Sequence, residues 1–136
     1  MGKNIIITGS SRGIGRAIAK KIARPGDHVI VNYLSNLEAA QETMRLVEER
    51  GATATAMQAN VRSEDDLKRL AAVFDRVDIL VHNAAIGALK PSMKMRRNQW
   101  DLTIESSLRP FWLLTKLCPL VEGALVFGIS SLGSRR

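Results

Sequence analysis

Residues 8–15 have the composition and position of a loop that binds phosphate. They read Thr-Gly-Ser-Ser-Arg-Gly-Ile-Gly, so Gly9, Gly13 and Gly15 follow the spacing G-x-x-x-G-x-G. Glycines allow a tight turn and a close backbone approach to a pyrophosphate, whose charge is attracted by the N–H groups that open the next helix. The spacing differs from G-x-G-x-x-G and from the G-K-[ST] P-loop. It predicts a dinucleotide site; the alternative is a plain tight turn.

Two neighbouring features favour a cofactor that carries a 2′-phosphate. NAD-binding folds usually place Asp or Glu about 20 residues past the glycine loop, where the carboxylate holds the ribose hydroxyls. Here residues 32–35, which include Tyr33 and Ser35, contain no carboxylate. Arg12 lies inside the glycine loop, and a guanidinium suits a phosphate. We therefore expect NADPH, with a merely solvated loop cation as the alternative interpretation of Arg12.

These residues require strands that end where the polar segments begin. Short β-branched or apolar runs predict strands, and apolar residues at helical spacing predict the helices between them. The expected strands cover residues 5–8, 29–31, 53–61, 77–81 and 125–129. The expected helices cover 16–24, a segment that starts at the Ser35/Glu38 capping box, a segment capped by Ser63, and a long helix over 98–117 that Pro110 should kink.

This alternation predicts an α/β fold. Strands separated by helices imply right-handed crossovers, hence a Rossmann-like doubly wound parallel sheet with helices on both faces. The expected strand order is 3-2-1-4-5, with the sheet truncated after the fifth strand. We expect the edge at residues 125–127 to be exposed and to promote association.

Composition excludes several classes of protein. Among 136 residues, 20 are Lys or Arg and 13 are Asp or Glu, which gives a net charge of +7. The cations are scattered and no zinc-finger or aromatic RNA-binding motif accompanies them, so nucleic acid is not expected as a partner. The longest uncharged run, residues 123–134, is too short to span a membrane. The lone Cys118 favours a reducing cytoplasm, and His28 and His82 lack further ligands for a metal.

Three further motifs follow the later strands. They are Asn60-Val61, Asn83-Ala84-Ala85 and Ser130-Ser131. With the glycine loop, this ordered set resembles the short-chain dehydrogenase/reductase family over the whole chain. More narrowly, residues 82–87, Trp100-Asp101 and residues 130–134 resemble the NADPH-dependent enoyl-acyl-carrier-protein reductases of that family.

The resemblance implies a role for each matching position. With Tyr33 and Ser35 at the end of the second strand, the expected cofactor-binding residues are Gly9, Ser11, Arg12, Gly13, Ile14, Gly15, Tyr33, Ser35, Asn60, Val61, Asn83, Ala84 and Ala85. The expected catalytic residues are Ser131, toward the substrate carbonyl, and Ser107, where the family commonly has the Asn of a proton relay. Taken singly, Asn60 could be a turn residue and Ser131 a strand-end cap. Their joint placement at strand ends favours a site.

One departure limits the expected activity. In the family the catalytic Tyr and Lys lie on the helix beyond the Ser-bearing strand, whereas this sequence ends at Arg136 and its single tyrosine is Tyr33. We therefore expect residues 1–136 to be the NADP(H)-binding part of a larger oxidoreductase domain, inactive alone. The expected substrate is a carbonyl or enoyl thioester, small or carried by an acyl carrier, and the full-length form should be a homo-oligomer. The alternatives are a non-catalytic nucleotide-binding member of the family and a basic interaction module.

Overall fold

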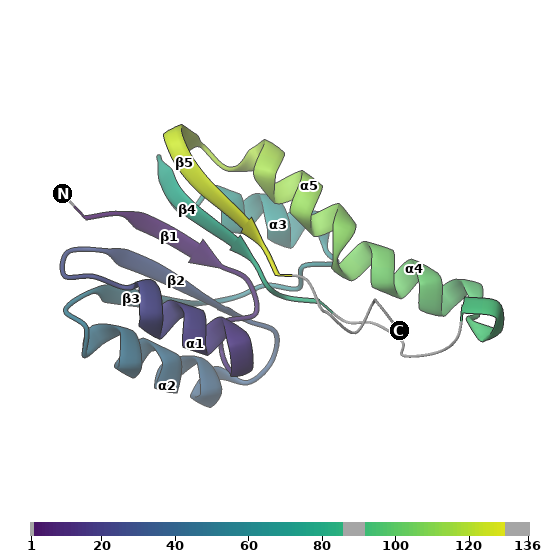
Figure 1. The fold of residues 1–136 in the computed structure, drawn as a ribbon, viewed down its shortest axis with the longest axis horizontal. Coiled ribbons are helices and arrows are strands. Elements are labelled where there is room, and N and C mark those ends of the chain that lie inside the picture. The colour runs from purple at the N-terminus through teal and green to yellow at the C-terminus, as the bar shows by residue number, and fades with distance from the viewer. Residues whose placement is uncertain (1, 86–91, 130–136) are drawn as a thin grey trace.

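The computed structural model describes residues 2–85 and 92–129 and contains one parallel sheet between two layers of helices (Figure 1). The strand order is β3-β2-β1-β4-β5, as predicted. The strands are β1 (Asn4–Ile7), β2 (His28–Tyr33), β3 (Thr53–Gln58), β4 (Val77–His82) and β5 (Leu120–Gly128). The helices are α1 (Gly13–Ile22), α2 (Leu37–Glu48), α3 (Glu64–Ala71), α4 (Arg97–Ser106) and α5 (Leu108–Leu117), and a 3-10 turn, η1, covers Ser92–Lys94.

The sheet separates two apolar cores, because side chains alternate between its faces. Ile5 and Ile7 of β1 pack with α1 and α2, whereas Ile6 packs with α3 and α5. All three isoleucines are fully buried. The short apolar strands are therefore continuous hydrophobic runs, as expected of a parallel sheet covered on both faces. No helix among residues 2–85 and 92–129 is long and apolar enough to cross a membrane.

The helix starts differ in part from the prediction. Ser63 caps α3 as expected, because its Oγ accepts the N–H of Asp66 at 3.2 Å. Ser35, however, does not cap α2. The N-cap is Asn36, whose Oδ1 accepts the N–H of Ala39 at 3.0 Å. The capping box at Ser35 is thus wrong by one residue, since a neighbouring amide side chain reaches the same set of free N–H groups.

The predicted long helix is divided into α4 and α5. Ser107 separates the two helices with φ −119° and ψ −65°. The break precedes Pro110, which lacks the N–H needed to bond residue 106 in a continuous helix. The single kinked helix that was predicted is therefore wrong, because the segment is interrupted at Ser107.

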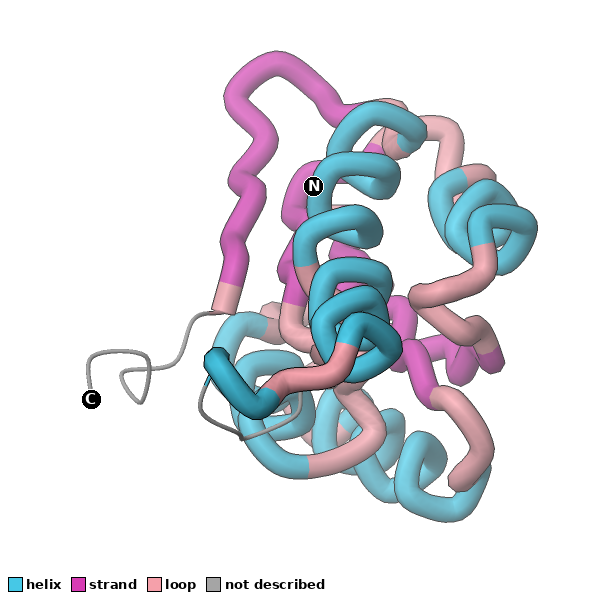
Figure 2. The backbone as a smooth tube through the Cα atoms, turned by 90° about the vertical axis from the view of Figure 1, so that its right-hand side faces the viewer, coloured by secondary structure: helices cyan, strands magenta, loops and turns pink. Residues whose placement is uncertain are grey.

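β5 is longer than expected and lies at one margin of the sheet (Figure 2). It begins at Leu120, and its pairing with β4 shifts register between Val77 and Ile79. Glu122 and Gly123 fall within the irregular stretch, so its sequence lacks a strand pattern. Leu125 and Phe127 remain 49% and 48% exposed, in agreement with the expected apolar edge. They line an open groove with Ile18 and Ile22 of α1.

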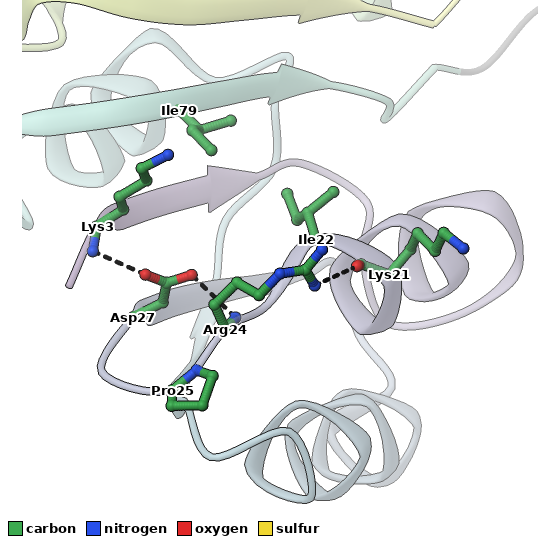
Figure 3. Close-up of a pocket in the computed structure, with 7 residues that line it drawn as sticks. All are labelled: Lys3, Lys21, Ile22, Arg24, Pro25, Asp27 and Ile79. Atoms are coloured by element: carbon green, nitrogen blue, oxygen red, sulfur yellow. Dashed lines mark hydrogen bonds between the residues drawn. The ribbon is translucent and has the colours of Figure 1, made fainter.

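A second hollow lies at the amino ends of β1 and β2, next to this groove (Figure 3). Asp27 occupies its base, and the two carboxylate oxygens accept the N–H groups of Lys3 and Arg24 at 2.8 and 3.0 Å. Asp27 is 5% exposed. Since both of its carboxylate oxygens are engaged in tying the chain before β1 to the turn before β2, we assign Asp27 a structural role.

Candidate functional site

The carboxyl ends of β1, β2, β3 and β4 surround a cavity of about 370 Å³. It is lined by Gly9, Ser11, Arg12, Gly13, Ile14, Asn32, Tyr33, Leu34, Ala59, Asn60, Val61, Arg62, Asn83, Ala84 and Ala85. Nearly all the residues predicted to bind cofactor are in this set. In an open α/β sheet, ligands bind in the crevice outside the carboxyl ends of the strands. The cavity lies where that rule places a ligand.

The glycine loop is held from both sides by amide side chains. Asn32, at the end of β2, accepts the N–H of Gly9 on Oδ1 at 2.9 Å. Asn83, after β4, donates from Nδ2 to the carbonyl of Gly9 at 3.0 Å. Both hydrogen-bonding groups of Gly9 are therefore engaged within the protein. The first residue of the loop is fixed before any ligand arrives.

Thr8 adds a third brace. Its Oγ1 accepts the N–H groups of Asn83 and Ala84 at 3.0 and 3.1 Å. Thr8 is buried, at 2% exposure. The end of β1 is thereby joined to the segment after β4, which explains why the loop and residues 83–84 line the same cavity.

Gly15 must be glycine because three parts of the chain meet there. A Cβ on this residue would lie 2.3 Å from the carbonyl oxygen of Gly9 and 2.6 Å from Nδ2 of Asn83. Gly9, by contrast, needs its positive φ of 64°. Gly15 does not line the cavity, but it allows α1 to approach the loop that does.

The N-terminus of α1 has no acidic group and no side-chain cap within the described chain. Its N-cap residue, Arg12, makes no capping hydrogen bond, and the first turn contains no acidic residue. An uncapped helix start presents free N–H groups and a positive dipole end. α1 begins at Gly13, three residues before the predicted start, so these N–H groups belong to the glycine segment itself.

The charge of the cavity is positive. Arg12 and Arg62 are its charged lining residues, and no carboxylate lines it. Arg12 makes no ion pair with any residue of the described ranges, whereas Arg62 pairs with Glu105 of α4 at 3.0 Å. A phosphate entering the cavity would therefore meet an uncompensated guanidinium at Arg12 and an uncapped helix start.

Asn60 combines the two roles considered for it. Its Oδ1 accepts the N–H of Arg62 at 3.0 Å, which makes a local turn after β3. Its own N–H donates to Asp66 at 2.8 Å. Asn60 is a turn residue that also lines the cavity, together with Val61.

His82, the last residue of β4, contacts α5 next to the cavity-lining segment 83–85. Its Nε2 lies 3.3 Å from Oγ1 of Thr115, and its ring centroid is 4.6 Å from that of Phe111. The Thr115 hydroxyl donates to the carbonyl of Phe111 at 2.7 Å, so Nε2 of His82 must carry the hydrogen between them. Burial lowers the pKa of His82 from 6.5 to about 4. His82 is therefore a neutral link between the end of β4 and α5.

Some predicted residues do not join the cavity. Ser35 is exposed and absent from its lining. Ser107 is also absent from the lining, and its hydroxyl donates to the carbonyl of Thr103. The predicted catalytic Ser131 lies outside the described residues. The structure thus assembles the expected cofactor side and leaves the catalytic side as a prediction.

Sequence analysis missed four lining residues: Asn32, Leu34, Ala59 and Arg62. Asn32 carried a usable signal, because it is the first polar residue after the apolar residues of β2. A buried amide at that point needs partners, and Nδ2 finds the carbonyls of Met57 and Ala59 at 3.3 and 3.2 Å. Arg62 had no distinguishing signal among the scattered cations.

Comparison with known proteins identifies the family of the chain. A family model described as short chain dehydrogenase matches residues 3–135. The chain belongs to this family. The family assignment confirms the resemblance seen in the sequence.

Individual relatives from this family cover almost all of the chain. It is 34% identical over 143 residues to the 3-oxoacyl-[acyl-carrier-protein] reductase FabG of Staphylococcus epidermidis, covering 98% of this chain and 59% of that protein. It is 38% identical over 140 residues to the 1-cyclohexenylcarbonyl-CoA reductase of Streptomyces collinus, covering 96% of this chain and 49% of that protein.

A solved relative supports the fold. The short-chain dehydrogenase of Burkholderia cenocepacia J2315, in complex with NADP, superposes with a TM-score of 0.87 at 31% identity. The match covers 100% of this chain and 58% of that one. The chain therefore spans about half the length of the relatives it matches.

Proposed function

We propose that this chain is the NADP(H)-binding domain of a short-chain oxidoreductase that reduces a carbonyl. The observation that carries the proposal is the cavity beside the braced glycine loop, which has Arg12 and Arg62 and no carboxylate in its lining. The 2′-phosphate distinguishes NADPH from NADH, and a guanidinium is a suitable partner for it. The NADP-bound relative from Burkholderia cenocepacia supports this choice.

Different residues of the chain would bind different parts of the cofactor. The N–H groups at the start of α1 would hold the pyrophosphate, and Arg12 the 2′-phosphate. Asn60 and Val61 would contact the adenine, and Ala84 and Ala85 the ribose nearer the nicotinamide. NADPH supplies a hydride when it is bound.

Catalysis requires a proton donor besides the cofactor. The family resemblance places a Tyr and a Lys after the fifth strand, whereas the only tyrosine here, Tyr33, lines the cofactor cavity at β2. A serine such as Ser131 has an unperturbed acidity far from neutral, and loss of a general acid typically costs about 10² to 10⁴ in rate. We propose that residues 1–136 bind NADPH without transferring hydride by themselves.

For the substrate we propose a 3-oxoacyl thioester, either small or attached to an acyl carrier. The similarity to FabG, whose name states that reaction, supports a carbonyl substrate. The narrower resemblance to enoyl reductases receives no support from FabG. An enoyl thioester remains the second candidate because of the similarity to the 1-cyclohexenylcarbonyl-CoA reductase. We further propose a homo-oligomeric enzyme of the cytoplasm, which fits the free, buried Cys118.

Binding of nucleotide to the purified chain tests the proposal. Isothermal titration should show tighter binding of NADPH than of NADH. Arg12→Ala should lower the affinity for NADPH by about tenfold and change the affinity for NADH little. Arg24→Ala is a matched control, because Arg24 lies at the opposite end of the sheet. Equal affinity of the wild-type chain for both nucleotides would remove the NADP assignment, and tight binding of duplex DNA instead would favour the basic interaction module.

A further inference from the structure

Arg16 makes three side-chain hydrogen bonds near the glycine loop, although it does not line the cavity. It lies in the first turn of α1 and is half-buried. Its Nη2 donates to the carbonyl of Ser11 at 2.6 Å and to that of Ala39 at 3.0 Å, and its Nε donates to Oγ1 of Thr43 at 3.0 Å. One side chain thus joins the glycine loop to α2.

The three acceptors form a consistent set. Thr43 is fully buried, and its hydroxyl donates to the carbonyl of Ala39 at 3.4 Å, which leaves its oxygen free to accept from Arg16. Arg16 makes no ion pair with a carboxylate in the described part of the chain. Only a planar guanidinium has several donors at fixed angles for such a set of oxygens.

The bond to Ser11 has a consequence for the next residue. The carbonyl of Ser11 and the N–H of Arg12 belong to one planar trans peptide and point in opposite directions. Because the Ser11 carbonyl is held toward Arg16, the direction of the Arg12 N–H is fixed as well. The orientation of this peptide plane also determines where the Arg12 side chain begins. Both Ser11 and Arg12 line the cavity.

We propose that Arg16 is a positioning residue that sets the selectivity of the site for NADPH over NADH. It acts through the Ser11–Arg12 peptide and through Thr43, and it touches no cofactor atom itself. This inference rests on the proposed function, because it assumes that Arg12 meets the 2′-phosphate. If the Ser11–Arg12 peptide is released, its N–H and those at the start of α1 are no longer oriented toward the pyrophosphate, which both nucleotides carry. NADPH additionally loses the placement of Arg12, so its affinity falls further.

The side chains offer variants that separate positioning from stability. Arg16→Met keeps most of the length and removes every donor. Thr43→Val removes the hydroxyl anchor on α2 with little change in volume, and Thr43→Ser restores it. The measurements are the Kd values of NADPH and NADH by isothermal titration and the thermal midpoint of the full chain.

Arg16→Met should raise the Kd of NADPH by about tenfold and that of NADH by about threefold, so that the selectivity for NADPH falls about threefold. Thr43→Val should shift selectivity in the same direction by less, and Thr43→Ser should restore it. An unchanged NADPH/NADH ratio in Arg16→Met would overturn the proposal even if the thermal midpoint falls, because a purely structural tie between α1 and α2 predicts that result.

The outcomes also separate this inference from the proposed function. A wild-type chain that does not prefer NADPH refutes the assignment of the cofactor, and the positioning role of Arg16 with it. A wild-type chain that prefers NADPH, combined with unaltered selectivity in the variants, refutes only the role of Arg16. If Arg16→Met fails to fold, the Thr43→Val and Thr43→Ser pair decides, since Arg16 is retained in both.

Discussion

Burial of His82 should make the stability of this chain depend on pH in a way that one substitution removes. The pKa of His82 is lowered from 6.5 to about 4, because burial disfavours the charged imidazolium. The unfolded chain therefore binds a proton near pH 6.5 that the folded chain binds only near pH 4. The stabilising contribution is complete above pH 6.5 and is lost as the pH falls through the folded pKa.

The size of the effect follows from the two pKa values. Between about pH 7.5 and about pH 5, a pKa that moves from 6.5 to about 4 removes about 2 kcal/mol from the free energy of unfolding. His82 is 8% exposed, so its imidazole is largely removed from water, which is the cause of the lowered pKa. Over this range the loss is a substantial fraction of the stability of a small domain.

Urea denaturation at the two pH values, in the wild type and in His82→Gln, measures the effect. Glutamine can retain an N–H donor toward Oγ1 of Thr115 but does not titrate. The wild type should lose about 2 kcal/mol more than His82→Gln on acidification. Since all other titrating groups are shared, their contribution cancels in the difference. Identical losses in the two proteins would refute the lowered pKa of His82, and with it the neutral imidazole of the folded chain.

Three further results are expected. Gly15→Ala should destabilise the chain more than Gly13→Ala in urea denaturation, since a Cβ at residue 15 meets the Gly9 oxygen at 2.3 Å, whereas one at residue 13 meets nothing within 4 Å and is strained only by the φ of 57°; equal losses would contradict the close approach. Asn36→Ala should cost about 1 kcal/mol in urea denaturation and Ser35→Ala less than about 0.5 kcal/mol, and the reverse order would return the cap to Ser35. Phe127→Lys should raise the monomer fraction in sedimentation velocity, because Phe127 is 48% exposed in an apolar groove; if only Trp112→Lys does so, the chain associates through α5 instead.

The sequence predicted the sheet well because its signals are local. The inner strands of the sheet are short apolar runs such as residues 5–7, and each of them is followed by a helix with an apolar face. The strand order then follows from the family resemblance and the handedness of crossovers. The start of β5 was missed, because residues 120–124 pair irregularly and include Gly123 with φ 80°. No alternation of side chains marks such a stretch.

The residues that line the cavity were predictable where the backbone itself forms it. The glycines at positions 9, 13 and 15 are recognisable from their residue type and spacing. The structure explains the glycine at position 15, because a Cβ there would collide with Gly9 and Asn83. Side chains that brace the loop were harder to find. Asn32 and Arg16 act through partners that lie 23 residues away along the chain, at Gly9 and at Ala39. Such pairings become visible only when the strands and helices are assembled.

Ser35 shows the limit of motif matching at short range. The pattern Ser35-x-x-Glu38 satisfies the capping box, yet Asn36 accepts the N–H of Ala39 instead. Either side chain can satisfy a free N–H at a helix start, so sequence alone does not choose between adjacent candidates. Ser35 also lies exposed and outside the cavity lining, so neither role predicted for it is seen.

The side chains that hold the glycine loop are separate from the predicted catalytic residue Ser107. Those on Gly9 come from Asn32 and Asn83, at the ends of β2 and β4, and the tie to α2 comes from Arg16. None of these contacts involves Ser107, whose hydroxyl is directed to Thr103 in α4. The supports of the glycine loop thus come from β1, β2, β4, α1 and α2, and none of them depends on Ser107. We therefore expect the chain to bind nucleotide whether or not a substrate site is complete, and the titrations with NADPH and NADH measure that binding directly.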